Sequence, residues 1–549
     1  TGALADDADR SIWILLRDKT DAAGRRIAWE DLGTGRQDAE LDLPVSRSYL
    51  ERLRSLGVEV RVCSRWLNAI SAQVSPDVER RVLTQDFVRE VRPVRRWRRP
   101  RPAETIPLPP RPKETRSQTV QQDLYGPAFA QLAQIGVIPL HDRGFTGAGV
   151  RIAVLDNGFH YIEHEAFREK FRLVAERDFV NGDGVVSDES NQPVTGDETR
   201  SAQNLHGGQV LSLRAGYEPN RFIGVAPDAE YILAKTEDNL TESPIEEDRW
   251  IAGLEWADSL GAQVVNSSLG YNIWDDGSGY VRADLDGETA LTSRAAALAV
   301  RRGMVVVVAA GNEAQAPWHY ITAPADAAGV IAVGSVDLPV GAVRAPVIAA
   351  SSSRGPTADG RIKPDVVAPG QGVVMADLRG GDYMRSTGTS FASPLVSGVC
   401  ALLLQAHPDW GPAQVLAALR STAQDLGEAG PDTVYGWGQV NALAASGLDI
   451  VQPGEHALLP PFPNPARNGV VHFPVQLAER DDVELSVFDL AGNLVFAASW
   501  QLVAGVYDRA GRAPRWQPAG AAADGLYYYS IRSAGFVRTG KIALLRRDP

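Results

Sequence analysis

The sequence lacks any long apolar run. Its most apolar stretch, Met304 to Ala310, is only seven residues long, whereas a membrane-spanning helix needs about 18 or more consecutive apolar residues. We therefore expect no membrane span. The 549 residues are 44% hydrophobic, 22% charged and 7% aromatic, a composition that excludes a collagen, a coiled coil or a wholly disordered chain.

Cysteine is nearly absent, since Cys63 and Cys400 are the only two. They fall in segments that we assign below to different domains, so we expect no structural disulfide. Both are predicted to be small buried apolar residues. The chain begins at Thr1 without Met and contains no basic-then-apolar signal segment, which we interpret as a leader removed beforehand. The sequence therefore supports export only indirectly.

Charge is distributed unevenly along the chain. Residues 1–116 carry 23 Lys and Arg against 18 Asp and Glu, whereas the whole chain carries 55 against 68. The remainder of the chain, residues 117–549, is therefore acidic, and nucleic-acid binding is not the main interpretation of this sequence. The arginines of residues 95–116 leave a nucleic-acid patch as an alternative, but the prolines among them favour a solvated, protease-accessible connector without regular hydrogen bonding.

The length predicts about three or four domains. Residues 1–96 are predicted to form a small α+β plait with strands at 11–19, 58–74 and 87–94 and a helix at 47–56. A second helix should begin after Ser75, because a serine N-cap followed by Pro76 is a helix-start signal. Residues 97–118 are the exposed Pro/Arg-rich linker.

Residues 119–447 alternate strand-like and helical patterns, which predicts an α/β domain with a parallel sheet flanked by helices. Residues 448–549 change to period-2 strands and Gly-containing turns at 491–493 and 534–535, which predict a β-sandwich. We find no internal repeats. The strands predicted for these two domains are 150–155, 231–235, 264–266, 305–309, 330–333, 483–490 and 526–531.

A serine stands at the start of a predicted buried helix. Gly388-Thr389-Ser390 precedes the mostly apolar run Leu395 to Leu404. A serine hydroxyl becomes a nucleophile only beside a base, and the free N–H groups of a helix start can stabilise an oxyanion. The alternative is that this serine is a simple N-cap.

Three further polar residues lie where parallel sheets carry their sites. Asp156 ends the strand 150–155, Asn312 follows the strand 305–309, and His206 precedes an apolar helix pattern. Each has a simpler interpretation when taken alone: Asp156 as a helix cap, Asn312 as a turn-forming residue and His206 as a structural histidine. Taken together, Asp156, His206 and Ser390 follow the chain order of the subtilisin triad.

Over about Leu124 to Ala445 the chain resembles the subtilisin-like serine peptidase family. The matching motifs are LDNG at 155–158, HGG at 206–208, NSSLG at 266–270, AAGN at 309–312, SSRGPTADGRIKPDVVAPG at 352–370 and GTSFASP at 388–394. The resemblance implies that Ser390 is the nucleophile, His206 the general base and then acid, and Asp156 the residue that orients the imidazole. Asn312 would stabilise the oxyanion together with the Ser390 N–H.

The resemblance also implies a substrate-binding region. Ser268-Leu269-Gly270 would be an edge strand that pairs with an extended peptide, and Ala310-Gly311 would line the primary specificity pocket. Two residues depart from the family pattern, because Asn157 replaces a Ser, Thr or Ala and Gly208 replaces a Thr. Gly208 is expected to loosen the helix start and slow the enzyme.

No metal site and no required cofactor are expected. The segments 274–287 and 178–188 are rich in aspartate, so calcium is an alternative. They lack EF-hand spacing, however, and solvated loops are the favoured interpretation.

The head resembles the inhibitory propeptides of the family, and the tail resembles Ig-like C-terminal modules, some of which are type IX secretion sorting domains. We therefore expect a secreted or cell-surface bacterial serine endopeptidase, made as a zymogen, whose partners are polypeptide substrates, its own propeptide and, through the tail, secretion machinery. The alternative is a catalytically silent scaffold or adhesion protein of the same fold.

Overall fold

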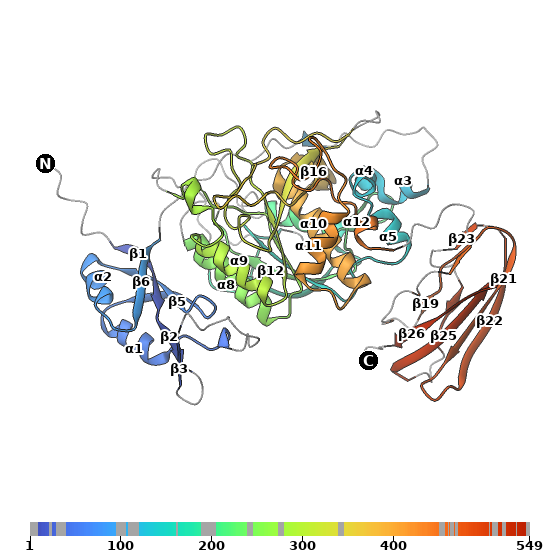
Figure 1. Cartoon of the computed structure of the whole chain (residues 1–549), viewed down its shortest axis with the longest axis horizontal. Helices are drawn as coiled ribbons and strands as arrows, with labels where there is room; N and C mark the ends of the chain where they lie inside the picture. The colour runs from blue at the N-terminus through green and yellow to red at the C-terminus, as the bar shows by residue number, and fades with distance from the viewer. Residues whose placement is uncertain are drawn as a thin grey trace.

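The chain forms three successive units, which follow one another from the N-terminus to the C-terminus in the computed structural model (Figure 1). The structure describes residues 9–20, 25–28, 40–94, 106–107, 120–160, 163–187, 205–238, 245–272, 279–338, 345–448, 456–458, 461, 466, 470–503, 505–507, 514–518, 523–533 and 535–544.

The head is a four-stranded antiparallel sheet with two helices on one face. Both predicted helices and the strand at 87–94 are confirmed, and Ser75 caps the second helix by accepting the Val78 N–H at 3.4 Å. The stretch 58–74, predicted as a strand, is divided into two strands at 59–64 and 69–74, and the stretch 11–19 contains a strand at 10–16 and the start of another at 18–20. A short hairpin of β2 (Asp18–Thr20) and β3 (Arg26–Ala28) extends from it. The sheet order is β4 (Glu59–Ser64), β5 (Ala69–Val74), β1 (Arg10–Leu16), β6 (Val88–Pro93), and the helices are α1 (Arg47–Ser55) and α2 (Pro76–Leu83).

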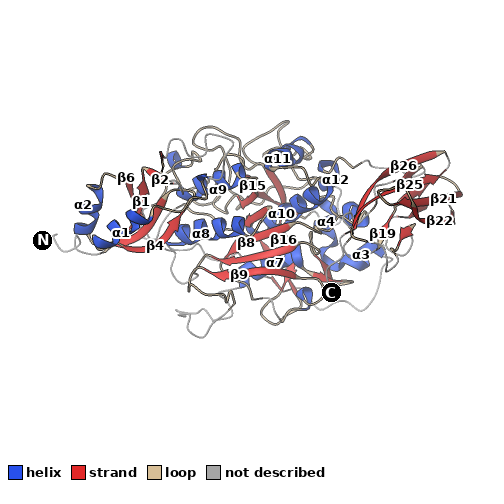
Figure 2. Cartoon of the chain, turned by 90° about the horizontal axis from the view of Figure 1, so that it is seen from below, coloured by secondary structure: helices blue, strands red, loops and turns tan. Residues whose placement is uncertain are grey.

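Strand β1 is apolar on both faces. Ile12 and Ile14 pack into the head's own core beneath α1 and α2. Trp13 and Leu15 point to the opposite face and join a core that contains residues of α8 (Ile245–Ser259) and α9 (Leu291–Arg301). Because successive strand residues alternate between faces, the head's sheet is packed between its own helices and the central unit (Figure 2).

The central unit is built on a nine-stranded sheet. Seven neighbouring strands, from β16 to β9, are parallel, while β17 and β7 are antiparallel. The predicted α/β fold is therefore confirmed, although β7, β9, β16 and β17 were not predicted. The sheet order is β7 (Ile106–Pro107), β17 (Tyr383–Thr387), β16 (Val366–Ala376), β15 (Ile331–Asp337), β14 (Val305–Ala309), β13 (Val264–Ser267), β8 (Arg151–Asp156), β12 (Glu230–Lys235), β9 (Arg172–Asp178).

Strand β7 corrects one expectation for the linker. Ile106 pairs with Arg385 and Pro107 with Met384, so this part of the linker takes part in the sheet. A proline is tolerated there because an edge strand has one side without ladder partners. The rest of residues 95–119 lies outside the described residues.

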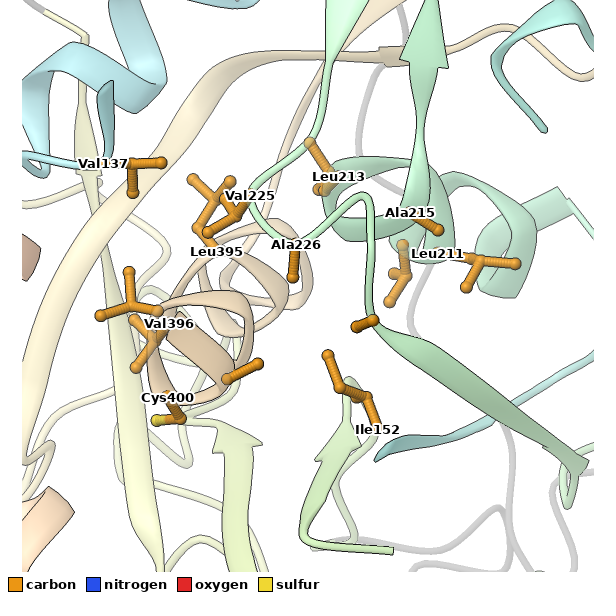
Figure 3. Close-up of a cluster of buried hydrophobic side chains, with 14 of the residues drawn as sticks. Val137, Ile152, Leu211, Leu213, Ala215, Val225, Ala226, Leu395, Val396 and Cys400 are labelled. Atoms are coloured by element: carbon orange, nitrogen blue, oxygen red, sulfur yellow. The ribbon is translucent and has the colours of Figure 1, made fainter. Parts of the chain in front are cut away.

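Helix α10 (Thr389–Ala406) lies at the centre of the central unit and packs against α7 (Leu205–Ala215) and the sheet (Figure 3). Among the described residues it is the one helix long and apolar enough to cross a membrane, and 83% of that window is buried inside the protein. The helices α11 (Pro412–Ser421) and α12 (Ala442–Ala445) also contact α10, and the central unit further contains the short helices α3 (Val120–Tyr125), α4 (Phe129–Gln134) and α5 (Ile138–Asp142). The short strands β10 (Tyr217–Glu218) and β11 (Phe222–Ile223) form a separate hairpin.

The C-terminal unit is a β-sandwich with its own apolar core. Gly492 and Gly535, in the two predicted turns, adopt φ of +85° and +83°, which glycine adopts without steric cost; Ala534 lies outside the described residues. The strands are β18 (Ala457–Leu458), β19 (Val471–His472), β20 (Val475–Leu477), β21 (Asp481–Phe488), β22 (Leu494–Leu502), β23 (Gly505–Tyr507), β24 (Arg515–Trp516), β25 (Gly525–Ser533) and β26 (Phe536–Leu544).

The two cysteines are both free thiols. Cys400 is fully buried on α10, as predicted (Figure 3), and burial raises the pKa of its thiol. The prediction that Cys63 is buried is wrong, because this residue is exposed on β4. Strand β4 is the outermost strand of the head's sheet, so one of its edges has no neighbouring strand.

Candidate active site

An aspartate and a histidine are joined at the carboxyl end of β8, an interior strand of the nine-stranded sheet. Asp156 is the last residue of β8 and is fully buried, while His206 lies in the first turn of α7 with 22% of its side chain exposed. His206 Nδ1 is 2.7 Å from Asp156 Oδ1. Because Nδ1 is held by the carboxylate, Nε2 is the ring nitrogen that can exchange a proton with a reacting group.

Asn157 fixes the start of α7 against the end of β8. Its side-chain Oδ1 accepts the Gly207 N–H at 3.1 Å, and its own N–H donates to Asp156 Oδ1 at 2.9 Å. Asn157 was recognised from the sequence as a departure from the family pattern. The structure gives it a positioning contact, since it ties together the segments that carry Asp156 and His206.

Ser390 is the second residue of α10 and is partly exposed. Its Oγ donates to Ser268 O at 3.1 Å, and Ser268 Oγ donates back to Ser390 O at 2.8 Å. Phe391, the next residue, has its ring centroid 5.7 Å from that of His206. The start of α10 therefore lies next to the histidine through Phe391, while the Ser390 hydroxyl itself is bonded to Ser268.

Asn312 is exposed and lies beside the start of α10. Its Oδ1 accepts the Thr389 N–H at 2.9 Å, and Thr389 Oγ1 accepts the Gly311 N–H at 3.2 Å. Since a backbone N–H can only donate, the amide oxygen must face Thr389 and the NH₂ group is directed elsewhere. The Ser390 N–H lies in the first helical turn, where no intrahelical acceptor exists. Both are donors suited to a developing oxyanion.

The segments expected to bind substrate lie next to these residues. Residues 268–270 continue the chain beyond the last ladder pair of β13, which ends at Ser267, and their pairing with a substrate stays a prediction. Ala310 and Gly311 follow β14, and Gly311 has φ of +106°. Gly270 and Gly311 both face the side chain of Thr322, a residue that the sequence gave no reason to single out.

Gly208 is required by packing. A Cβ atom at this position would lie 2.3 Å from Leu378 Cδ1 and 2.8 Å from His160 O. The expectation of a loosened helix start is therefore incomplete, since the space that a side chain would fill is occupied by neighbouring residues. The sequence could not reveal this, because Leu378 and His160 are far from Gly208 in the chain.

We predict that Gly208→Thr, which restores the usual family residue, destabilises this protein. The collision with the His160 backbone would lower the free energy of unfolding by about 1–3 kcal/mol, the usual cost of overpacking. It would also displace His206, which lies two residues before Gly208. Both the thermal midpoint and kcat should therefore fall. Gly184→Thr is the control, because a Cβ there meets nothing within 4 Å. Equal or higher activity of Gly208→Thr would contradict the prediction.

The acidic loops considered for calcium are partly described. Asp178 accepts the Val180 N–H and pairs with Lys235, Asp284 accepts the Val281 N–H, and Asp286 accepts the Glu288 N–H. Within the described residues no group of three His, Cys, Asp or Glu side chains could hold a metal ion. Asp188, Asp275 and Asp276 lie outside them.

Two buried carboxylates of α8 hold the head. Asp248 accepts hydrogen bonds from Ser71 and Arg61, the latter at 3.0 Å. Glu255 accepts from Ser64 Oγ at 2.5 Å and from the Trp66 N–H at 3.2 Å. Burial raises the pKa of Asp248 to about 6 and also raises the pKa of Glu255. The sequence analysis did not single out either carboxylate.

A buried Asp–His pair, a helix-start serine and an exposed amide, all at one edge of a parallel sheet, are the arrangement of a serine hydrolase. The subtilase family model matches residues 147–438, and a model described as the peptidase S8 propeptide domain of Bacteroidota matches residues 33–106. The chain belongs to the subtilase family.

Individual relatives agree with this assignment, and a solved structure agrees with the fold. The chain is 31% identical to subtilisin E of Bacillus subtilis over 60% of its own length and 74% of that protein. It is 31% identical to subtilisin of Bacillus pumilus over 57% of its own length and 97% of that protein. A crystal structure of fervidolysin from Fervidobacterium pennivorans, a keratinolytic enzyme related to subtilisin, superposes with a TM-score of 0.56 at 18% identity, covering 98% of this chain and 91% of that one.

Proposed function

We propose that the chain is the zymogen of a bacterial serine endopeptidase in which Ser390, His206 and Asp156 form the catalytic triad. The observation that carries the proposal is the 2.7 Å contact between His206 Nδ1 and buried Asp156 Oδ1, beside a serine at a helix start. Membership of the subtilase family and the match to a propeptide domain support it.

In the proposed mechanism, Ser390 Oγ attacks the carbonyl carbon of a peptide bond while His206 Nε2 takes its proton. Asp156 stabilises the imidazolium that forms, and the Asn312 amide and the Ser390 N–H donate to the oxyanion. His206 then protonates the leaving amine, and an acyl-enzyme on Ser390 remains. Water activated by His206 releases the acid product. No cofactor is required for these steps.

The head is proposed to be an intramolecular inhibitor that is cut from the peptidase within residues 94–122. Its attachment to α8 through Arg61, Ser64 and Ser71 supports a folded head that stays bound after cleavage. Export to the cell surface or medium is proposed from the subtilisin relatives. The C-terminal β-sandwich is proposed to contact the secretion machinery. No nucleic-acid partner is proposed.

The proposal is tested by labelling the purified protein with a fluorophosphonate probe, which reacts with an activated serine. We expect one labelled band, smaller than the 59.1 kDa chain by about the mass of the head, and no labelled band after heat denaturation. Absence of labelling from native protein, even after the head is removed by limited proteolysis, would favour the silent scaffold.

The buried carboxylates of α8 predict that the head binds more tightly at acid pH. With the head bound, burial raises the pKa of Asp248 from its ordinary 3.8 to about 6 and raises that of Glu255, against the opposite effects of Arg61 and Arg65. Release of the head would expose these carboxylates to water and lower both pKa values towards the ordinary ones. A carboxyl group whose pKa is higher with the head bound than with the head released stabilises the bound state when it is protonated. Its full contribution is present at pH values below the pKa of the released state, and it is lost as the pH rises through the pKa of the bound state. Affinity should therefore fall between about pH 4 and pH 6.

This pH dependence can be measured on the cleaved protein by size-exclusion chromatography. We expect more of the cleaved head to co-elute with the peptidase at pH 4.5 than at pH 7.5. Asp248→Asn, which is neutral at every pH, should reduce the difference. A head that is retained better at the higher pH would show that the sign is wrong.

A further inference from the structure

Helix α7 carries a buried arginine two turns after His206. Arg214 is 0% exposed, and its Nη1 group donates to Ser397 Oγ on α10 at 3.0 Å. Its Nε and Nη2 groups have no hydrogen-bond partner among the described residues. A buried charge without an opposite charge beside it is unfavourable for the stability of a fold. Residues that break a stability rule in this way are expected where function requires them.

Helix α10 approaches closely where this side chain meets it. A Cβ atom on Gly398, in the interior of α10, would be 3.5 Å from Arg214 Cγ and 2.6 Å from Val225 Cβ. Leu213 of α7, Val225 and Leu395 of α10 belong to the same apolar core and are drawn in Figure 3. Glycine within a helix is unfavourable relative to alanine, so α10 also departs from the most stable sequence at this point.

The elements around α7 supply few charges. Helix α7 packs mainly against α10, β16, β11, β8 and the short helix η4 (Glu165–Phe167). No Asp, Glu, Lys, Arg or His occurs in α10, β16 or β11; α10 contains Cys400, and burial raises the pKa of its thiol. Glu165 of η4 has 55% of its side chain exposed. Strand β8 carries Arg151 at its amino end and the fully buried Asp156 at its carboxyl end.

Asp156 has an incomplete set of hydrogen bonds. Its Oδ1 accepts the Asn157 N–H and faces His206 Nδ1, whereas its Oδ2 has no hydrogen-bond partner among the described residues. A buried carboxylate needs such partners, or a nearby positive charge, to stay ionised. Burial lowers the pKa of Arg214 to about 10, and Tyr231 of β12 and Asp156 oppose that decrease. The arginine is therefore charged at neutral pH and within electrostatic reach of Asp156.

The geometry of α7 sets the size of this effect. Arg214 follows His206 by eight residues, about 12 Å along a helix axis, and helical side chains tilt towards the N-terminal end of their helix. The guanidinium therefore extends towards the end of α7 that carries His206. At an effective dielectric constant of about 20, a unit charge about 12 Å away changes a pKa by about one unit.

We propose that Arg214 is a positioning residue of the proposed triad, whose buried charge disfavours the addition of a proton to the Asp156–His206 pair in the resting enzyme. The sign is the same for both groups, because a cation attracts the carboxylate and repels the imidazolium. Arg214 thereby extends the activity of the enzyme towards lower pH. The proposal rests on the proposed peptidase activity and adds to it a residue that acts through Asp156 and His206.

The test is the pH dependence of kcat/KM for the self-processed full chain, with succinyl-Ala-Ala-Pro-Phe-p-nitroanilide as substrate. In Arg214→Met we expect the midpoint of the acid limb to move to higher pH by about 0.5–1 unit, because the pair takes up a proton more readily. Arg214→Lys keeps the charge and should restore the wild-type midpoint. Each midpoint is taken from the normalised profile of one preparation, so it does not depend on the fraction of folded enzyme.

Ser397→Ala separates the charge of Arg214 from its hydrogen bond. It removes the hydroxyl that accepts from the guanidinium and leaves the charge in place, so the acid limb should stay at the wild-type position. Arg214→Gln, which is neutral and polar, gives the same comparison as Arg214→Met if the methionine variant does not fold.

The proposal is overturned if the acid limb of the neutral variants coincides with that of wild type, or if Ser397→Ala moves it as far as they do. Failure of the peptidase proposal is distinguishable, because in that case wild type cleaves no substrate and no serine is labelled.

Discussion

Replacement of Ser390 by alanine is expected to abolish turnover and to leave the chain at its full mass of 59.1 kDa. Without Oγ no acyl-enzyme forms, and the histidine has no hydroxyl to activate. The expected loss in kcat is about 10⁶-fold, the size of the effect for the catalytic serine of subtilisin. The measurement is hydrolysis of a chromogenic peptide together with the mass of the purified chain.

Ser393→Ala is the matched control on the same helix. Ser393 is buried one turn beyond Ser390, and its Oγ donates to Asn266 Oδ1 at 3.1 Å. Its loss should lower stability by about 1–3 kcal/mol, through the unpaired acceptor left on Asn266, but should leave labelling and maturation intact. Normal self-cleavage of Ser390→Ala would assign the nucleophile to another residue.

The sequence predicted most elements whose residues carry a strong local pattern. The strands 150–155 and 305–309 were found because they are short, continuous apolar runs, and α2 was found because Ser75 and Pro76 mark its start. Strands β9 and β17 were missed, since mixed sequences such as RLVAERD become strands by pairing with neighbours. Pro107 joined the sheet for the same reason, as tertiary pairing overrode the local preference.

The residues of the proposed triad were selected from the sequence by their chain order and the motifs around them, whereas the contacts that support them could not be predicted. The hydrogen bond from the Gly207 N–H to Asn157 links residues 50 positions apart, and the contact of Thr322 with Gly270 also crosses distant segments. Such contacts depend on how strands are ordered in the sheet. Strand β1 has a second apolar face, formed by Trp13 and Leu15. This face could have predicted from the sequence that the head packs against another unit, because the sheet of an isolated two-layer domain needs only one apolar face.

The second large effect is expected at Asn312. Its amide oxygen is held by Thr389, so its NH₂ group is the part available to the oxyanion. Asn312→Ala removes that donor, which is engaged fully only when the carbonyl oxygen gains negative charge. We therefore expect kcat to fall by about 10² to 10³-fold, a magnitude known from subtilisin, with KM nearly unchanged. Steady-state kinetics on one peptide substrate separates the two constants.

Asn312→Asp tests whether the donor, and not the contact with Thr389, is responsible. Aspartate keeps an oxygen that can accept the Thr389 N–H, but it has no NH₂ group and adds a negative charge where the oxyanion develops. It should therefore be at least as slow as Asn312→Ala while folding as stably as wild type. If Asn312→Asp kept wild-type kcat, the role of Asn312 would be to hold the start of α10, and the oxyanion would depend on the Ser390 N–H and other donors.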